Sequence, residues 1–339
     1  MKPTAIFDGF PRTMELLFTA ADRARLESLV DLAVWTDGLM PAEEVEKHLP
    51  ELGVVLGQTA LPRERLDRAP RLKAVINVEG NFGTNLDYDT CFMRGIHVLN
   101  AGNAFGPAVA EMALGLGLAL ARGIPQADRA FHAGTEVYGR HSNRDAFLLS
   151  GADVGLIGFG NLGRALQRLL EPFGCRLRVH DPWLPSRWLA QFGMIPASIE
   201  EVLSVSRLVF VTAGVTVENR AMLDERRLSL MPKGAGLVLV SRAALVDFEA
   251  LTRKLGAGEL RAALDVFPEE PFAANHPLRR LDNVILSAHR SGGVSEAYYL
   301  MGEMIVDDLA LILQGLPPVR LQRAERETAA RMRSAQVPK

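Results

Sequence analysis

The sequence has few cysteines, no dominant sign of charge and no long unbroken apolar run. Only two of its 339 residues are cysteines, so we expect no disulfide framework, no bound metal and a reducing, cytoplasmic setting. The 38 basic and 40 acidic side chains nearly cancel, which argues against nucleic acid or a membrane surface as a partner. The apolar stretch around residues 112–121 is broken by glycines and too short to span a bilayer, and the first residues lack a secretion-signal pattern.

The chain contains enough residues for about two domains of ~150 residues each, and short apolar runs recur along both halves. Runs that are apolar on successive residues are typical of strands buried on both faces of a parallel sheet. From residue 151 onward six such runs alternate with helical segments, enough for a full dinucleotide-binding sheet: 154–158, 176–181, 207–213, 235–241, 261–267 and 283–288. Five further runs precede residue 101: 4–9, 29–35, 52–57, 72–78 and 96–100. The pattern predicts an α/β protein with two Rossmann-like domains, the first flavodoxin-like, and a long apolar helix over about 107–122 between them.

Two features mark helix ends in the second half. Ser198 lies three residues before Glu201, the spacing of a capping box at a helix N-terminus. Gly174 is placed where a helix beginning near Leu162 should end.

A glycine-rich loop follows the first strand of the second half. Gly158, Gly160 and Gly163 form GxGxxG between an apolar run and a helical segment, the context in which a helix N-terminus binds a pyrophosphate. Asp181 ends the next predicted strand, where its carboxylate can accept bonds from the ribose hydroxyls and repel a 2′-phosphate. The pattern predicts bound NAD; Arg187 leaves NADP as the alternative.

Three chemically useful residues follow three successive predicted strands. Arg242 comes after the strand at 235–241, Glu270 after that at 261–267 and His289 after that at 283–288. Ligands of open parallel sheets bind at the carboxyl ends of strands, so these side chains are expected to converge. The arginine can bind a carboxylate, the histidine can transfer a proton, and a carboxylate beside a histidine favours its protonated form. Structural roles remain open for each: a hydrogen-bonded loop histidine, a carboxylate capping a turn, and an ion pair between Arg242 and Asp247.

At these residues the sequence resembles the D-isomer-specific 2-hydroxyacid dehydrogenase family, with phosphoglycerate dehydrogenases among its members. The resemblance covers about residues 50–318. Its motifs are EGNFGTNLD, RGIHVLNAGNAFGPAVAEMALGLGLALAR, VGLIGFGNLGRAL followed by Asp181, LVSRAALVDFEAL, ALDVFPEEP and VILSAHRSGG. It implies an NAD-dependent oxidoreductase that interconverts a small D-2-hydroxy acid and its 2-keto acid.

The resemblance also implies a domain plan and a set of roles. The substrate domain comprises residues 1–105, the NAD-binding domain 106–294 and a return segment 295–320, followed by a solvated tail at 321–339. A homodimer formed through the NAD-binding domain is implied as well. The implied catalytic set is Arg242, Glu270 and His289. The cofactor-binding candidates are Gly158, Gly160, Asn161, Leu162, Gly163, Asp181, Thr212, Ser241 and Asp265, the last for the nicotinamide carboxamide. The loop from Gly80 to Thr84 is expected to hold the substrate carboxylate, with Gly80, Asn81, Phe82, Gly83 and Arg242 as its substrate-binding residues.

The sequence departs from the family pattern at three places. Thr212 begins the segment that replaces the usual HxPxT, so packing near the adenine can differ. Arg290 follows the histidine, and either binds a second acidic group of the substrate or pairs with Glu296. Residues 57–59 are Gly, Gln and Thr where phosphoglycerate dehydrogenases place arginines, although Arg63 and Arg65 follow.

Three functions are compatible with these residues. The first is the dehydrogenase, with phosphoglycerate as the leading named substrate. The second is an NAD(H)-sensing binding protein on the same fold, resembling the C-terminal-binding corepressors; no long low-complexity tail supports it. The third is a formate or phosphite dehydrogenase, against which Glu270 argues, because formate dehydrogenases typically carry glutamine there.

Overall fold

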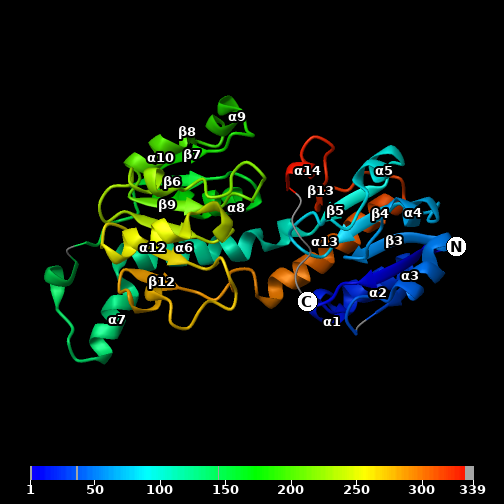
Figure 1. Cartoon of the computed structure of the whole chain (residues 1–339), viewed down its shortest axis with the longest axis horizontal. Coiled ribbons are helices and arrows are strands. Elements are labelled where there is room, and N and C mark those ends of the chain that lie inside the picture. The colour runs from blue at the N-terminus through cyan, green and yellow to red at the C-terminus, as the bar shows by residue number, and fades with distance from the viewer. Residues whose placement is uncertain (1, 36, 144, 333–339) are drawn as a thin grey trace. The chain divides into compact units, whose positions relative to one another are not determined.

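The computed structural model describes residues 2–35, 37–143 and 145–332 (Figure 1). The chain divides into two compact units. Unit 1 comprises the residues up to Phe105 and those from Val294 onward, and unit 2 comprises Gly106–Gly293. Unit 2 is therefore inserted between the two segments of unit 1.

Unit 1 contains a six-stranded sheet that is parallel apart from one edge strand. In spatial order its strands are β13 (Gln322–Arg323), β5 (His97–Asn100), β4 (Ala74–Asn77), β3 (Leu52–Gly57), β1 (Thr4–Asp8) and β2 (Asp31–Val34). Only β13 runs antiparallel to its neighbour. The order 5-4-3-1-2 is that of flavodoxin-like sheets, so the expected fold of this half is confirmed.

Helices cover both faces of this sheet, which explains the unbroken apolar runs. One face carries α1 (Met14–Leu17), α2 (Ala20–Leu29) and α13 (Ser295–Leu313), and the other carries α3 (Ala42–His48), α4 (Arg63–Asp67) and α5 (Tyr88–Met93). Phe7 and Val54 point into the first core, while their neighbours Ile6 and Val55 point into the second. Because successive strand residues face opposite sides, every position must be apolar.

The end of the chain is more ordered than the expected solvated tail. Residues 322–323 form β13 on the edge of the sheet, and α14 (Ala329–Met332) follows. Leu321, Ala324 and Ala329 are buried, and burial of these apolar side chains holds the segment on unit 1. Residues 333–339 lie outside the described residues.

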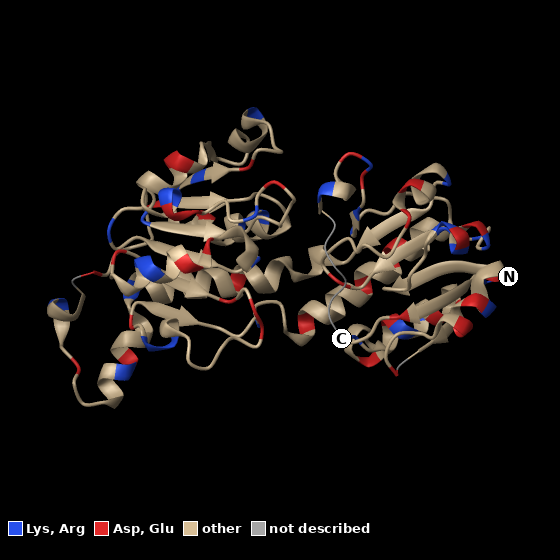
Figure 2. Ribbon diagram, in the orientation of Figure 1, with Lys and Arg blue, Asp and Glu red and all other residues tan. Residues whose placement is uncertain are grey.

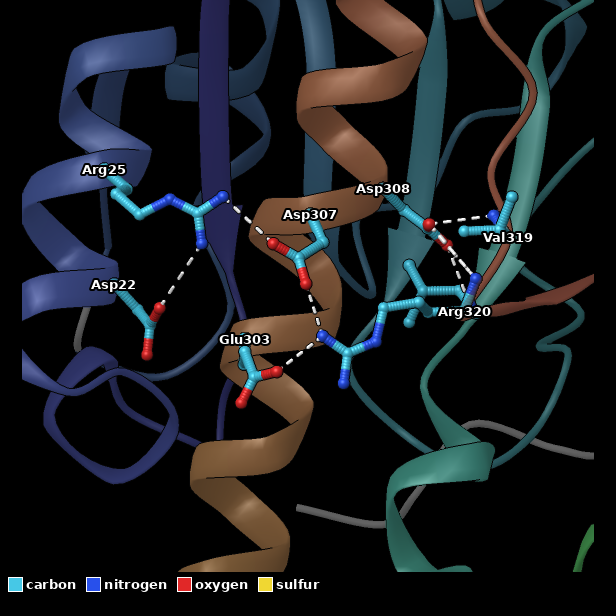
Figure 3. Close-up of polar contacts among 8 residues, drawn as sticks. Asp22, Arg25, Glu303, Asp307, Asp308, Val319 and Arg320 are labelled. Atoms are coloured by element: carbon cyan, nitrogen blue, oxygen red, sulfur yellow. Dashed lines mark hydrogen bonds and ion pairs between the residues drawn. The ribbon is translucent and has the colours of Figure 1, made fainter.

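Asp308 anchors this segment to α13. Its carboxylate is fully buried and accepts the backbone N–H groups of Val319 (2.8 Å), Arg320 (3.0 Å) and Leu321 (2.7 Å). Figure 3 shows these bonds beside an ion-pair network in which Arg320 contacts Asp307 and Glu303, and Arg25 contacts Asp307 from α2. The buried acceptor thus satisfies three donors that no strand pairs at that point.

We expect Asp308→Asn to lower the free energy of unfolding by about 2 kcal/mol, because an amide group must turn toward buried N–H donors. Urea denaturation measures this. Asp307→Asn is the matched control; its side chain is 31% exposed, so the expected loss is below about 1 kcal/mol. Equal losses in the two variants would contradict the assignment of Asp308 as the anchor.

Unit 2 contains a seven-stranded parallel sheet of the doubly wound type. Its spatial order is β12 (Val284–Leu286), β11 (Arg261–Leu264), β10 (Gly236–Leu239), β9 (Leu208–Val211), β6 (Asp153–Ile157), β7 (Arg176–His180) and β8 (Ile195–Pro196). Six strands are those expected. The seventh, β8, is a two-residue edge strand that the apolar pattern does not signal.

Helices cover both faces of this sheet as well. One side carries α6 (Gly106–Arg122) and α8 (Asn161–Leu170), and the other carries α10 (Ile199–Val205), α11 (Glu225–Leu228) and α12 (Phe248–Gly256). The long apolar helix is confirmed in α6. Gly117 lets it approach the sheet, since a Cβ there would be 2.7 Å from the Phe210 ring. The Ser198 hydroxyl caps α10 and Gly174 ends the turn after α8 in a left-handed conformation, also as expected.

The helical segment Gly102–Arg122 is longer than the apolar stretch expected from sequence. By length and apolarity it passes a test for a membrane span, and half of the tested window is buried inside the protein. Its α6 portion packs against β9, β10, β11 and α8, the surroundings of a core helix. Figure 2 shows acidic and basic residues interspersed over both units, in keeping with the near-neutral charge.

Candidate active site

The glycine loop connects β6 to α8 in unit 2. Gly158 has φ +94°, and a Cβ on it would lie 2.5 Å from the Cα of Ala213. A Cβ on Gly163 would lie 2.5 Å from the carbonyl oxygen of Gly158, so only glycine allows the helix to begin this close to the strand. By contrast, a Cβ on Gly160 would meet nothing within 4 Å. The loop therefore leaves open space over the N-terminus of α8, where a dinucleotide pyrophosphate fits.

Asp181 follows β7, beside this loop. Its Oδ2 accepts the N–H of Phe159 at 2.8 Å and its Oδ1 accepts the N–H of Trp183 at 3.0 Å. A carboxylate oxygen has a second acceptor site, so the fixed side chain can still receive ribose hydroxyl groups. Its negative charge disfavours a 2′-phosphate at that position.

The remaining cofactor candidates differ in how they are engaged. Asn161 and Leu162 are the first residues of α8. The Thr212 hydroxyl donates to the carbonyl of Gly158 at 2.7 Å, so it holds the glycine loop. The Ser241 Oγ is buried and has no hydrogen-bond partner among the described residues, which leaves it able to bond with a bound molecule. Together with the open glycine loop, these groups fit a dinucleotide.

His289 and Glu270 meet at the carboxyl edge of the sheet. The Nδ1 of His289 lies 2.6 Å from Oε2 of Glu270, while Oε1 of the same carboxylate accepts the N–H of Phe267 at 3.0 Å. The carboxylate thus caps the turn after β11 and also orients the histidine, which unites two roles that the sequence left as alternatives. Both side chains are partly exposed, at 47% and 37%, and the Nε2 of His289 is the ring nitrogen that does not face the carboxylate.

The backbone of His289 is held in an uncommon conformation by Asp265. His289 has φ +48°, and its N–H donates to the carbonyl of Asp265 at 2.7 Å. The buried carboxylate accepts the N–H groups of Arg290 and Ser291, both at 3.1 Å, and the Ser291 hydroxyl at 2.6 Å. Burial raises the pKa of Asp265, but these hydrogen bonds outweigh it, so the pKa lies below its ordinary value. This anchoring of the histidine loop was not expected; Ser291, a departure from the family pattern, was its only signal in the sequence.

Arg242 follows β10, the neighbour of β11 in the sheet. Its side chain is exposed, and its Nη1 donates to the carbonyl of Ser241 at 2.7 Å. Asp247, the partner considered from sequence, caps α12 by accepting the N–H of Ala250. Arg242, Glu270 and His289 therefore extend from three adjacent strand ends, β10, β11 and β12.

The predicted substrate loop follows β4 in unit 1. Gly80 packs against Gly102, with 3.5 Å between its Cβ position and the Gly102 Cα. The Asn77 amide donates to the carbonyl of Asn81 at 3.2 Å, Phe82 is buried, and the Tyr88 hydroxyl donates to the carbonyl of Gly83 at 2.7 Å. The loop is thus braced by its own unit. No group of three metal-ligating side chains occurs in the described part of the chain.

The doubly wound sheet, the open glycine loop and the ribose-side acid define a dinucleotide-dependent dehydrogenase class. A sequence profile described as "D-isomer specific 2-hydroxyacid dehydrogenase, NAD binding domain" matches residues 114–291, just over half of the chain. The chain belongs to this family of NAD-dependent oxidoreductases acting on CH–OH donors.

Relatives with printed activities are similar over most of this chain. D-3-phosphoglycerate dehydrogenase of Methanocaldococcus jannaschii is 32% identical over 302 residues, 86% of this chain but only 55% of that protein. Glyoxylate reductase of Pyrococcus furiosus is 31% identical over 307 residues, 88% of this chain and 91% of that one. Among solved structures, a phosphoglycerate oxidoreductase from Rhizobium etli is 43% identical, with a TM-score of 0.88 over 96% of this chain and all of that one.

Proposed function

We propose that the protein interconverts a D-2-hydroxy acid and its 2-keto acid, with His289 and Glu270 as the acid–base pair and Arg242 as the substrate anchor. The observation that carries the proposal is the 2.6 Å contact between His289 Nδ1 and Glu270 Oε2. It leaves Nε2 directed away from the carboxylate, on the strand edge where Arg242 also lies.

In the oxidation direction, Nε2 of His289 takes the proton of the substrate hydroxyl group, and in reduction it returns that proton to the carbonyl oxygen. Glu270 keeps the ring in one orientation and stabilises the imidazolium that forms. Arg242 binds the substrate carboxylate through two parallel bonds and polarises the adjacent C2 carbonyl. NAD, when bound, supplies the nicotinamide ring that exchanges hydride with C2. The candidates at Gly158, Gly160, Asn161, Leu162, Gly163, Asp181, Ser241 and Asp265 would hold it.

The proposal is tested by NADH consumption with a panel of 2-keto acids: glyoxylate, hydroxypyruvate, pyruvate, 2-oxoglutarate and phosphohydroxypyruvate, with NADPH in parallel. We expect turnover of at least one acid and a preference for NADH. The names of the relatives place phosphohydroxypyruvate and glyoxylate first. Tight NADH binding without turnover of any acid would instead favour an NAD(H)-sensing binding protein.

We also propose that the protein forms a homodimer through the arm that extends from unit 2 (Figure 1). The arm begins with α7 (Ile124–His132), which has no buried residue. Large apolar side chains remain exposed along it: Ile124 at 54%, Phe131 at 63% and Tyr138 at 75%. A monomer rarely leaves such a patch in water.

We expect sedimentation velocity at micromolar concentration to give twice the chain mass of 37.0 kDa, and Phe131→Glu to shift it to the monomer, because a charge would be buried at the interface. Exposed Val217, outside the arm, supplies the control Val217→Glu. A monomeric wild type would overturn the dimer proposal.

The cytoplasm is the compartment we propose. Cys91 and Cys175 are both free thiols. Burial raises the pKa of Cys91 to about 11, which keeps it protonated and unreactive.

A further inference from the structure

A buried ion pair joins two loops at the carboxyl edge of the unit 1 sheet. Arg12, in the loop after β1, donates from Nε to Oε1 of Glu79 at 2.8 Å and from Nη2 to Oε2 at 2.7 Å. The side chains are only 15% and 9% exposed. Burial alone lowers the pKa of Arg12, but the hydrogen bonds and charge of Glu79 raise it above the ordinary value, so the guanidinium stays charged.

Aromatic rings fix the guanidinium group from other parts of unit 1. Its carbon lies 5.4 Å from the ring centre of Phe105 and 5.0 Å from that of Tyr298, within the range of cation–π contacts. Glu79 is fixed as well, because its N–H donates to the Asn77 side chain at 2.9 Å and its carbonyl accepts the N–H of Ala101 at 3.2 Å. The cation is thus held in one orientation by groups from four segments.

Stability alone is a weak reason for this arrangement. Buried ion pairs often contribute no more to stability than apolar side chains of similar volume, since removing two charges from water is costly. A fixed orientation of the guanidinium is what the pair and the rings achieve together.

The position of Arg12 points to a ligand. In a sheet of order 5-4-3-1-2, ligands bind at the switch point between the first and third strands, and Arg12 follows the first. Glu79 directly precedes Gly80, where the proposed substrate loop begins. The segment after β3, at residues 57–62, contains no basic residue.

The two arginines that follow that segment are engaged elsewhere. Arg65 donates from Nε to Glu46 at 2.8 Å, and Arg63 lies 3.9 Å from Asp67 on its own helix. Neither therefore replaces the arginines that the family pattern places after the third strand.

We propose that Arg12 determines substrate specificity: its Nη1, the terminal nitrogen not committed to Glu79, donates to a second acidic group of the 2-keto acid whose first carboxylate the Gly80–Gly83 loop holds. Glu79 is the positioning residue that aims this nitrogen. The inference rests on the proposed function and adds the class of substrate, one with a phosphate or a second carboxylate at the end remote from C2.

The test uses the double variant Arg12→Gln, Glu79→Gln, which removes both charges and keeps two groups that can hydrogen-bond. The readout is the ratio of kcat/KM for a two-acid substrate to kcat/KM for hydroxypyruvate, measured with full-length protein and saturating NADH. Phosphohydroxypyruvate and 2-oxoglutarate serve as separate arms, which distinguish a phosphate from a carboxylate. We expect the preferred arm's ratio to fall at least about ten-fold, the effect of one lost hydrogen bond to a charged group.

Arg63→Gln is the control, an exposed arginine on α4 for which the ratio should not change. If the double variant does not fold, Arg12→Lys keeps the charge but not the planar fork, and its ratio should fall several-fold. A parallel loss of kcat/KM on both kinds of substrate, or a wild type without preference for either two-acid substrate, would overturn the inference and leave the proposed function intact. A wild type that reduces none of the acids would refute the proposed function, and the inference with it.

Discussion

The variant His289→Ala is expected to lose about 10²- to 10⁴-fold in kcat, the usual contribution of a general acid–base group. The loss should occur in both directions, because the same Nε2 takes the proton in oxidation and returns it in reduction. NADH binding should survive, since the glycine loop and Asp181 lie on other strand ends. Steady-state kinetics and a fluorescence titration with NADH measure the two effects separately.

The companion variant Glu270→Gln keeps a hydrogen-bond acceptor for the N–H of Phe267 but removes the charge beside the imidazole. We expect a smaller loss of kcat than in His289→Ala and a changed pH profile. His48→Ala, on α3 of unit 1, is the matched control and should behave as the wild type. Loss of NADH binding in a folded His289→Ala variant would show that the histidine has been assigned the wrong role.

The second large effect is expected for Arg242→Ala. Its contacts to the substrate carboxylate exist in the bound substrate and strengthen as charge develops on the C2 oxygen, so KM should rise and kcat should fall together. Two charge-assisted bonds at ~1.5–3 kcal/mol each correspond to a loss of about 10²- to 10⁴-fold in kcat/KM.

Arg242→Lys separates charge from geometry. A lysine keeps the positive charge but cannot form two parallel bonds, so part of the loss should remain. Arg253→Ala removes an exposed arginine that pairs with Glu225 on α12, and should leave kcat/KM unchanged. An unchanged kcat/KM in Arg242→Ala would exclude this arginine from the site.

The sequence by itself determined the class of fold and the order of the chemistry along it. The apolar runs predicted the strands because a sheet covered on both faces needs apolar residues at successive positions. The glycine loop was predictable because it depends on neighbours along the chain: a strand, a turn that only glycine tolerates, and a helix. The same holds for Arg242, Glu270 and His289, which each follow a recognisable strand.

Tertiary structure alone decided which distant groups meet. Arg12 and Glu79 are 67 positions apart, and the anchoring of residues 319–321 by Asp308 depends on how α13 packs, so no local pattern signals either contact. The edge strands β8 and β13 have two residues each, too few for a periodic pattern, and exist because a neighbouring strand offers unpaired backbone groups. Asp265 shows the same division: its place after a strand was readable, whereas its bonds to Ser291 arise only when β11 and β12 lie side by side.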